Sequence, residues 1–188
     1  MFTAFLDANV LVPVHLCDTM LRCAEVDPYR PVWSEKVLDE ARRAIHAIHP
    51  DLSESRIASR FSNMNTAFPF SLIAERHWEG KVPGIHVPDP NDRHVVAAAA
   101  AAGADVIVTA NIRDFPIAEL AEYSLERVDP GTFLRDMLDL NPEAVRHALH
   151  MQICNLRRPP MTIQMLLDRL LRANVAEFVA DYRSLYSD

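Results

Sequence analysis

The chain has 188 residues, 49% of them hydrophobic and 24% charged, which suits one ordinary soluble domain with a modest appendage. The formal net charge of −7 at pH 7 argues against a protein that binds nucleic acid by bulk attraction alone. It does not exclude an enzyme whose clustered acids are neutralised by bound metal. The longest apolar stretch, residues 95–108, is alanine-rich and interrupted by Gly103 and Asp105, so no membrane span is expected.

The chain starts without a basic segment before its apolar residues, so we expect no signal peptide. Cys17, Cys23 and Cys154 form no CxxC pair, and we expect buried, reduced thiols in a cytoplasmic protein. The histidines form no HExxH pattern, and there is no GxGxxG or phosphate-binding glycine loop among only four glycines.

The first predicted element is a buried strand over residues 2–6, which runs through Asp7 into a helix. A second helix begins at Ser34, a suitable N-cap, and places Val37, Leu38, Ala41, Ala44, Ile45 and Ile48 on one face. Asp39 falls nearly opposite, whereas Glu40 falls at the margin of the buried face. That position favours Glu40 as a functional acid.

Residues 53–80 suggest one or two further helices, followed by a short strand over residues 85–87. Pro90 suits the first position of an alanine-rich helix that ends at Gly103, which makes Asp89 its N-cap and leaves Asp92 free on the first turn. Residues 104–110 read as a buried strand, with the turn to Asp114 after it and a further helix and strand near 116–128.

From Asn141 the pattern becomes helical throughout, with Asn141 and Thr162 as caps. We therefore predict two parts, an α/β domain over residues 1–140 and a helical extension over residues 141–188. The extension carries six arginines against five acids, whereas residues 1–140 carry thirteen basic and twenty-one acidic residues. Its apolar positions at helical spacing are Val145, Leu149, Ile153, Leu156, Leu166, Leu167, Leu170 and Leu171.

Four acids stand at comparable points of successive strand–helix units: Asp7, Glu40, Asp92 and Asp114. The carboxyl ends of parallel strands meet at one edge of a sheet, so these carboxylates should gather there. Gathered carboxylates repel one another unless cations intervene, and Mg²⁺ and Mn²⁺ prefer oxygen ligands. Each acid alone is more often a cap, a turn residue or a solvated helix acid. Together they predict a divalent metal site of the kind used in phosphodiester hydrolysis.

The motifs LDANVLV, SEKVLDEARRA, DPNDRHVVAAAAAAGADVIVT and TANIRDF together resemble PIN-domain ribonucleases, and most closely the VapC-type toxins of bacterial toxin–antitoxin systems. The resemblance covers roughly residues 1–130, and the tail is similar to the C-terminal helical extension of one toxin subgroup. It implies a PIN-like parallel β-sheet flanked by helices. It places the catalytic and metal-binding acids at Asp7, Glu40, Asp92 and Asp114, with Asn9, Thr109 and Asn111 as supporting groups.

The resemblance further implies Mg²⁺- or Mn²⁺-dependent endonucleolytic cleavage of RNA, with structured RNA such as tRNA among the candidate targets. A cognate antitoxin protein and a homodimer are the partners it implies. Candidate phosphate contacts near the acids are Arg42, Arg43, Arg93 and Arg113, and Arg157 and Arg158 are candidates in the tail.

Several alternatives stay open. Asp89 is the alternative third acid to Asp92, and its Asn variant would distinguish a cap from a metal ligand. The chain could be a PIN-like module that has lost catalysis and only binds RNA or a partner, or a housekeeping nuclease. A haloacid-dehalogenase phosphatase is disfavoured, because Asn9 stands where its second Asp is needed and no lysine follows Lys81.

Overall fold

The computed structural model describes residues 1–26, 29–156 and 159–186. By the contacts of its residues the chain divides into two compact units. We call Met1–Val12 with Arg30–Val128 the sheet unit, and Pro13–Tyr29 with Asp129–Asp188 the helical unit. The division of the chain at residues 140 and 141 stays a prediction.

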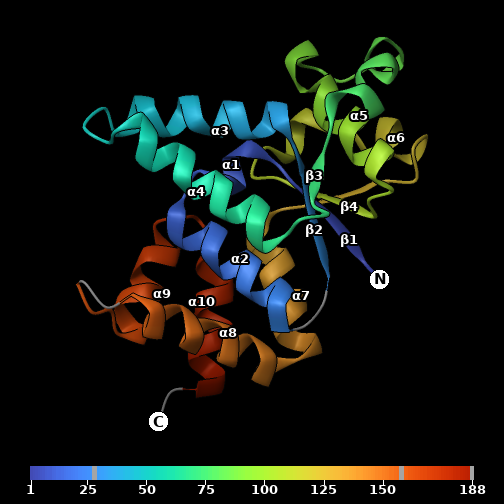
Figure 1. Cartoon of the computed structure of the whole chain (residues 1–188). Coiled ribbons are helices and arrows are strands. Elements are labelled where there is room, and N and C mark those ends of the chain that lie inside the picture. The colour runs from blue at the N-terminus through green and yellow to red at the C-terminus, as the bar shows by residue number, and fades with distance from the viewer. Residues whose placement is uncertain (27–28, 157–158, 187–188) are drawn as a thin grey trace. The chain divides into compact units, whose positions relative to one another are not determined.

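The sheet unit contains a parallel sheet, as the sequence predicts, and this sheet has five strands (Figure 1). The strand order is β3-β2-β1-β4-β5, so β1 lies at the centre and is flanked by β2 and β4. The strands are β1 (Thr3–Leu6), β2 (Arg30–Ser34), β3 (Leu72–Ile73), β4 (Val106–Val108) and β5 (Glu126–Val128).

The register of the central strands aligns the predicted site. Leu6 of β1 pairs with Val108 of β4, so Asp7 and Thr109 follow side by side at the carboxyl edge of the sheet. The backbone N–H of Asp7 donates to the carbonyl of Val108 at 3.1 Å, which extends the pairing by one residue. The buried apolar strands thereby fix the place of both polar side chains.

Helix α3 (Glu35–Ile48) follows β2 and packs against α4 (Glu54–Ala67). The Ser34 hydroxyl accepts from the Val37 N–H at 3.2 Å, which confirms the predicted N-cap. Most of the expected apolar face is buried as far as Ile45, with Ala44 half-buried, but Ile48 is 60% exposed, because the helix ends there at His49.

Helix α5 (Arg93–Ala102) follows a single 3₁₀ turn, Pro90–Asp92, and packs on β2, β3 and β4. The Asp89 carboxylate accepts from the Asn91 N–H at 2.8 Å, so Asp89 caps the 3₁₀ turn, whereas α5 begins later than predicted, with Asp92 at its N-cap position. Gly103 ends the helix at φ 62°, in the left-handed region that glycine adopts without strain.

Two sequence-based assignments in this unit were wrong. Residues 85–87 form no strand, because the His86 N–H donates to the Glu119 carboxylate at 2.6 Å instead of joining a ladder. Their apolar pattern reflects burial of Ile85 and Val87 alone. The missing strands are β2 and β3, and β3 lies inside the segment 53–80 that was expected to be helical.

In its described residues the helical unit contains α2 (Val14–Val26) and four helices after residue 129. Asn141 and Thr162 cap α8 and α9 by accepting from Ala144 and Met165 backbone N–H groups, as predicted. The four helices are α7 (Pro130–Leu140), α8 (Pro142–Asn155), α9 (Ile163–Leu171) and α10 (Ala176–Tyr186).

Most of the predicted apolar positions in and beside α8 and α9 are buried, with three departures. Leu171 is exposed at the end of α9, and Ile153 is only partly buried, as is Leu156 just after α8. Cys17 and Cys23 are buried as expected, whereas Cys154 is exposed at the end of α8. Arg157 and Arg158 lie outside the described residues. In the part of the chain that the structure describes, no helix has the length and apolar character needed to cross a membrane.

Candidate active site

Asp7 is the anchor of the candidate site. It follows β1 and caps the short helix α1 (Ala8–Leu11), and its side chain is buried. Its Oδ1 accepts from the Ala8 N–H at 2.7 Å. Its Oδ2 accepts from Asn9 Nδ2 and from the Thr109 hydroxyl, both at 2.7 Å. Three donors therefore fix the orientation of this carboxylate.

The Thr109 hydroxyl uses all of its hydrogen-bonding capacity. It donates to Asp7 and accepts from Asn9 Nδ2 and from the Asn111 backbone N–H, each of the latter at 3.0 Å. Asn9 Oδ1 in turn accepts from the Ala110 N–H at 2.9 Å. Asn9 and Thr109 thus support Asp7 directly, whereas Asn111 takes part through its backbone.

Asp92 lies among other carboxylates at the start of α5. Burial, followed by repulsion from Asp7, Asp89 and Asp114, raises the pKa of Asp92 from its ordinary value of 3.8 to about 6. Burial also raises the pKa of Asp7, and the nearby Glu40 carboxylate adds to that rise, while hydrogen bonds from Thr109 and Ala8 oppose it. These mutual effects show that the carboxylates share one region.

Glu40 lies in contact with His94, a residue that the sequence analysis did not identify as a site residue. His94 Nε2 lies 2.9 Å from Glu40 Oε1, and His94 is only 2% exposed. Neither ring nitrogen has a well-aligned hydrogen bond, so the pair is a close contact rather than a directed bond. The Trp78 ring lies against His94, with 6.0 Å between the ring centroids. His94 also lowers the pKa of both Asp7 and Asp92, which places it inside the same region.

The donor chemistry of this region suits a hard divalent cation. Within the described ranges, the Asp92 and Asp114 carboxylates accept no hydrogen bond and so remain available as oxygen ligands. The same ranges hold no group of three or more His, Cys, Asp or Glu side chains spaced closely enough to enclose an ion. Mg²⁺ commonly binds through one or two carboxylates and keeps several waters, so the available oxygens fit a cation of this type.

The four candidate arginines differ in their surroundings. Arg42 forms an ion pair with Asp39 and lies 5.6 Å from the centre of the Phe61 ring. The Nε of Arg43 donates to the Asp39 carbonyl at 3.3 Å, which leaves its terminal nitrogens exposed. Arg113 is exposed beside Asp114, and Arg93 is partly buried.

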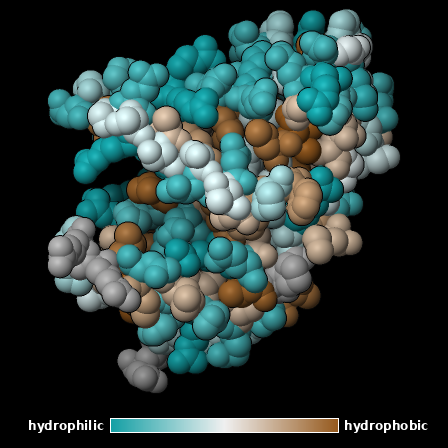
Figure 2. All heavy atoms as spheres, viewed as in Figure 1, coloured by the Kyte–Doolittle hydropathy of each residue, from teal (hydrophilic) through white to brown (hydrophobic). Residues whose placement is uncertain are grey.

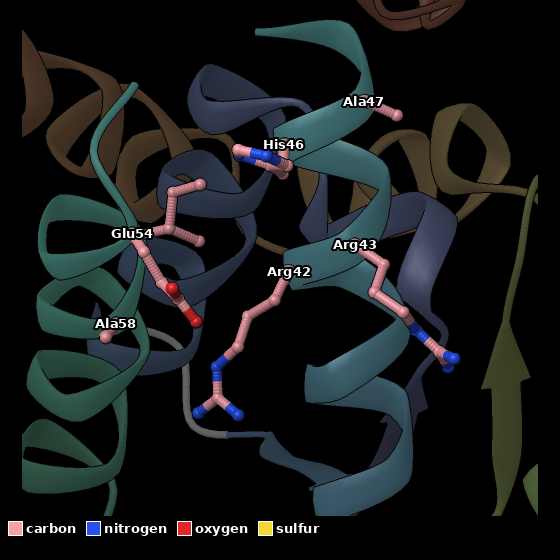
Figure 3. A pocket seen from close by; sticks show the side chains of 7 residues that line it. Arg42, Arg43, His46, Ala47, Glu54 and Ala58 are labelled. Atoms are coloured by element: carbon pink, nitrogen blue, oxygen red, sulfur yellow. The ribbon is translucent and has the colours of Figure 1, made fainter. Parts of the chain in front are cut away.

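A pocket of about 450 Å³ lies between α3 and α4, lined by Arg42, Arg43, His46, Ala47, Glu54, Ile57 and Ala58. In Figure 3, Arg42 extends between the two helices toward the side of Glu54, whereas Arg43 points away from α4. None of the four candidate acids lines this pocket, so it is distinct from the carboxylate cluster. The surface over α3 is predominantly hydrophilic in the view of Figure 2.

Comparisons with known proteins agree with the fold and the acid pattern. The family model described as "PIN domain" matches residues 3–113, and the model described as "VapC50 C-terminal domain" matches residues 130–184. A Mycobacterium tuberculosis protein described as "Putative ribonuclease VapC50" is 40% identical over 95 residues. That match covers 50% of this chain and 56% of the relative, so the chain spans about half the length of the curated relative it matches. No solved structure matches.

The sequence resemblance is thereby confirmed on two separate stretches of the chain. The match to the PIN domain covers more than half of the residues and ends beside Asp114, and it includes Asp7, Glu40 and Asp92. The parallel sheet and the position of its carboxyl edge agree with that match. This chain is a member of the PIN domain family, with a C-terminal region like that of VapC50.

Proposed function

We propose that this protein is a metal-dependent endoribonuclease and the toxin of a bacterial toxin–antitoxin pair. The observation that carries the proposal is the placement of Asp7 at the carboxyl edge of the sheet, where it is hydrogen-bonded to Thr109 after β4 and where repulsion from Asp7, Asp89 and Asp114 adds to burial in raising the pKa of Asp92. Mutual repulsion between carboxylates favours the binding of a cation between them. The similarity to a ribonuclease of the VapC type supports RNA as the substrate.

In this proposal the cation is Mg²⁺ or Mn²⁺, held by Asp7, Asp92, Asp114 and Glu40. A bound ion of this type would lower the pKa of an attacking water and stabilise the charge that develops on the phosphate. Asp7 holds its carboxylate in one orientation because Asn9, Thr109 and the Ala8 N–H bind it. Asp92 and Asp114 supply the oxygens that no described donor occupies.

Asp92, rather than Asp89, is the third acid in this proposal. The Asp89 carboxylate is exposed and accepts from the backbone N–H and from the side chain of Asn91. Arg43 and Arg113 are the more suitable phosphate contacts of the four arginines, because no described acid occupies their terminal nitrogens. Partner binding by an antitoxin and assembly into a homodimer remain part of the proposal.

The test is expression of the wild-type chain and of Asp7→Asn in a bacterium, with total RNA examined for cleavage. Wild type should arrest growth and cleave RNA, the variant should do neither, and co-expression of the adjacent small gene product should relieve the arrest. Cleavage of RNA in vitro without any effect on growth in several hosts would identify a housekeeping nuclease instead.

One observation favours a second candidate, a PIN-like module that binds RNA or a protein without cleaving. The described residues hold no ready-made group of three ligands for an ion. Titration of the purified protein with Mn²⁺ separates the two functions. Saturable binding that is lost in Asp92→Asn supports the nuclease, and absence of binding at millimolar Mn²⁺ supports the inactive module.

A further inference from the structure

The C-terminal helices of the helical unit contain a pocket of about 360 Å³ that the metal site does not use. Helices α8, α9 and α10 lie together in this unit (Figure 1), and α9 contacts both of the others. The pocket is lined by Arg146, His150, Ile153, Ile163, Gln164, Leu167, Tyr182, Arg183 and Tyr186. Two of these residues are arginines, two are tyrosines, and none of the lining residues is acidic.

The two arginines are held at the pocket by acids that lie outside its lining. Arg146 Nη1 lies 3.3 Å from Glu143 Oε2, and Arg183 Nη2 lies 3.0 Å from Asp168 Oδ1. Both pairs are solvent-exposed, and such pairs typically contribute only ~0–1 kcal/mol. Each guanidinium has five N–H donors, so an anion in the pocket can bind without breaking these contacts.

Tyr186 supplies partly exposed aromatic surface beside these cations, whereas Tyr182 is buried. The Tyr182 and Tyr186 rings lie 4.9 Å apart between centroids, and the Phe178 ring lies 6.2 Å behind Tyr182. Arg146 covers the Tyr186 ring with 5.3 Å from its guanidinium carbon to the centroid. Burial raises the pKa of Tyr182 and of Tyr186, so both phenols stay protonated near neutral pH.

Cations interleaved with aromatic rings are the combination that binds single-stranded nucleic acid, because bases stack on rings while arginines contact phosphates. The volume of the pocket is in the range of small-ligand sites. The chain as a whole carries a net charge of −7, so RNA affinity has to come from local cationic surface. An acidic peptide would use the arginines but would leave the tyrosine surface without a matching partner.

From these observations we infer that the pocket between α8, α9 and α10 binds one nucleotide of a single-stranded RNA. Arg146 and Arg183 contact its phosphate, and Tyr186 stacks on its base. This inference rests on the proposed ribonuclease function, because it assigns the substrate a second contact in the C-terminal region. Arg157 and Arg158, which lie outside the described residues, stay a separate prediction.

The test uses the full chain with Asp7→Asn as a non-cleaving background and a fluorescent single-stranded RNA of mixed sequence as the probe. Arg146→Ala, Arg183→Ala and Tyr186→Ala are compared with Arg172→Ala. Arg172 is a matched control because it is an exposed arginine of the same unit that does not line the pocket. Thermal unfolding of each variant shows that the fold is retained.

Each pocket arginine variant should weaken RNA binding by about fivefold or more and reduce the salt dependence by roughly one phosphate contact. Tyr186→Ala should weaken binding by at least about fivefold, while Tyr186→Phe, which keeps the ring, stays near the parent. Arg172→Ala should stay within about twofold of the parent protein. Photocrosslinking with 4-thiouridine RNA should label Tyr186.

Equal effects of the pocket variants and Arg172→Ala would overturn the inference, and so would RNA affinity that no pocket variant changes. RNA affinity that no pocket variant changes would overturn the inference even if the pocket were found to bind an acidic protein instead. Wild-type cleavage of the same RNA with Mn²⁺ is measured in parallel. Cleavage by wild type together with unaffected pocket variants refutes the pocket alone, whereas no cleavage by wild type refutes the proposed function.

Discussion

Replacing Asp92 by Asn should make the metal-free protein more stable at neutral pH. Asp92 has a pKa of about 6 in the folded protein against an ordinary 3.8, and this difference corresponds to about 3 kcal/mol of unfavourable free energy. Solvent screening at this partly exposed site reduces the expected gain to about 1 kcal/mol. For a chain of this size such a gain raises Tm by roughly 2–4 °C.

The gain has a defined pH dependence, because the pKa of this acid is raised rather than lowered. Below about pH 3 the carboxyl is protonated in both the folded and unfolded states, so wild type and Asp92→Asn should have the same stability. The penalty on wild type develops between about pH 4 and 6 and is complete above pH 6. Thermal unfolding in EDTA across this range measures the difference directly.

Asp89→Asn is the matched control: Asn keeps the cap, and because Asp89 is exposed and only one of the carboxylates that repel Asp92, this variant should raise Tm less than Asp92→Asn does. Addition of Mn²⁺ should make wild type more stable than Asp92→Asn, which reverses their order in EDTA. A cation present at about a hundred times its Kd stabilises wild type by about 2.7 kcal/mol and Asp92→Asn by much less. A lower Tm of Asp92→Asn in EDTA at pH 7.5, or a gain that is the same at every pH, would refute the reasoning.

Three further predictions concern the supports of the site. Asp7→Asn should abolish cleavage without the stability gain of Asp92→Asn, because one amide oxygen cannot accept from all three donors; calorimetry of the two variants side by side checks this. Thr109→Val should cost about 1–3 kcal/mol in urea unfolding and reduce cleavage, since a fully buried hydroxyl joins Asp7 to Asn9 and to the Asn111 backbone; unchanged stability would show that this network is unimportant. Ser34→Ala should cost about 0.5–2 kcal/mol through loss of the α3 cap, with Ser34→Thr as the conservative control, and an equal loss in both variants would contradict the capping role.

The central part of the sheet was predictable because β1 and β4 are uninterrupted buried apolar runs that lead directly into polar residues. The strand β2 was missed because Arg30–Ser34 contains Pro31, which cannot donate a ladder hydrogen bond. The structure tolerates this proline because β3 pairs only with Trp33 and Ser34, so β2 has no neighbour on that side at Pro31. A strand as short as β3 has no periodicity that could reveal it.

The acids at the sheet edge follow from topology, and this is why their sequence positions were informative. Glu40 comes from the helix after β2, Asp7 from the end of β1 and Asp114 from the turn after β4, and these three strands are neighbours in the sheet. His94 was not singled out, because a histidine on the first turn of an alanine-rich helix has no distinguishing spacing. Its contact with Glu40 depends on how α3 and α5 pack, which a sequence pattern does not encode.

The most direct test of the central claim is digestion of RNA by purified wild type and Asp7→Asn, each with Mn²⁺ and with excess EDTA. Our account predicts cleavage by wild type with Mn²⁺ and none in the other three reactions. Cleavage that persists in EDTA, or in the Asp7→Asn protein with Mn²⁺, would contradict a metal-dependent site built on the acids at the carboxyl edge of the sheet.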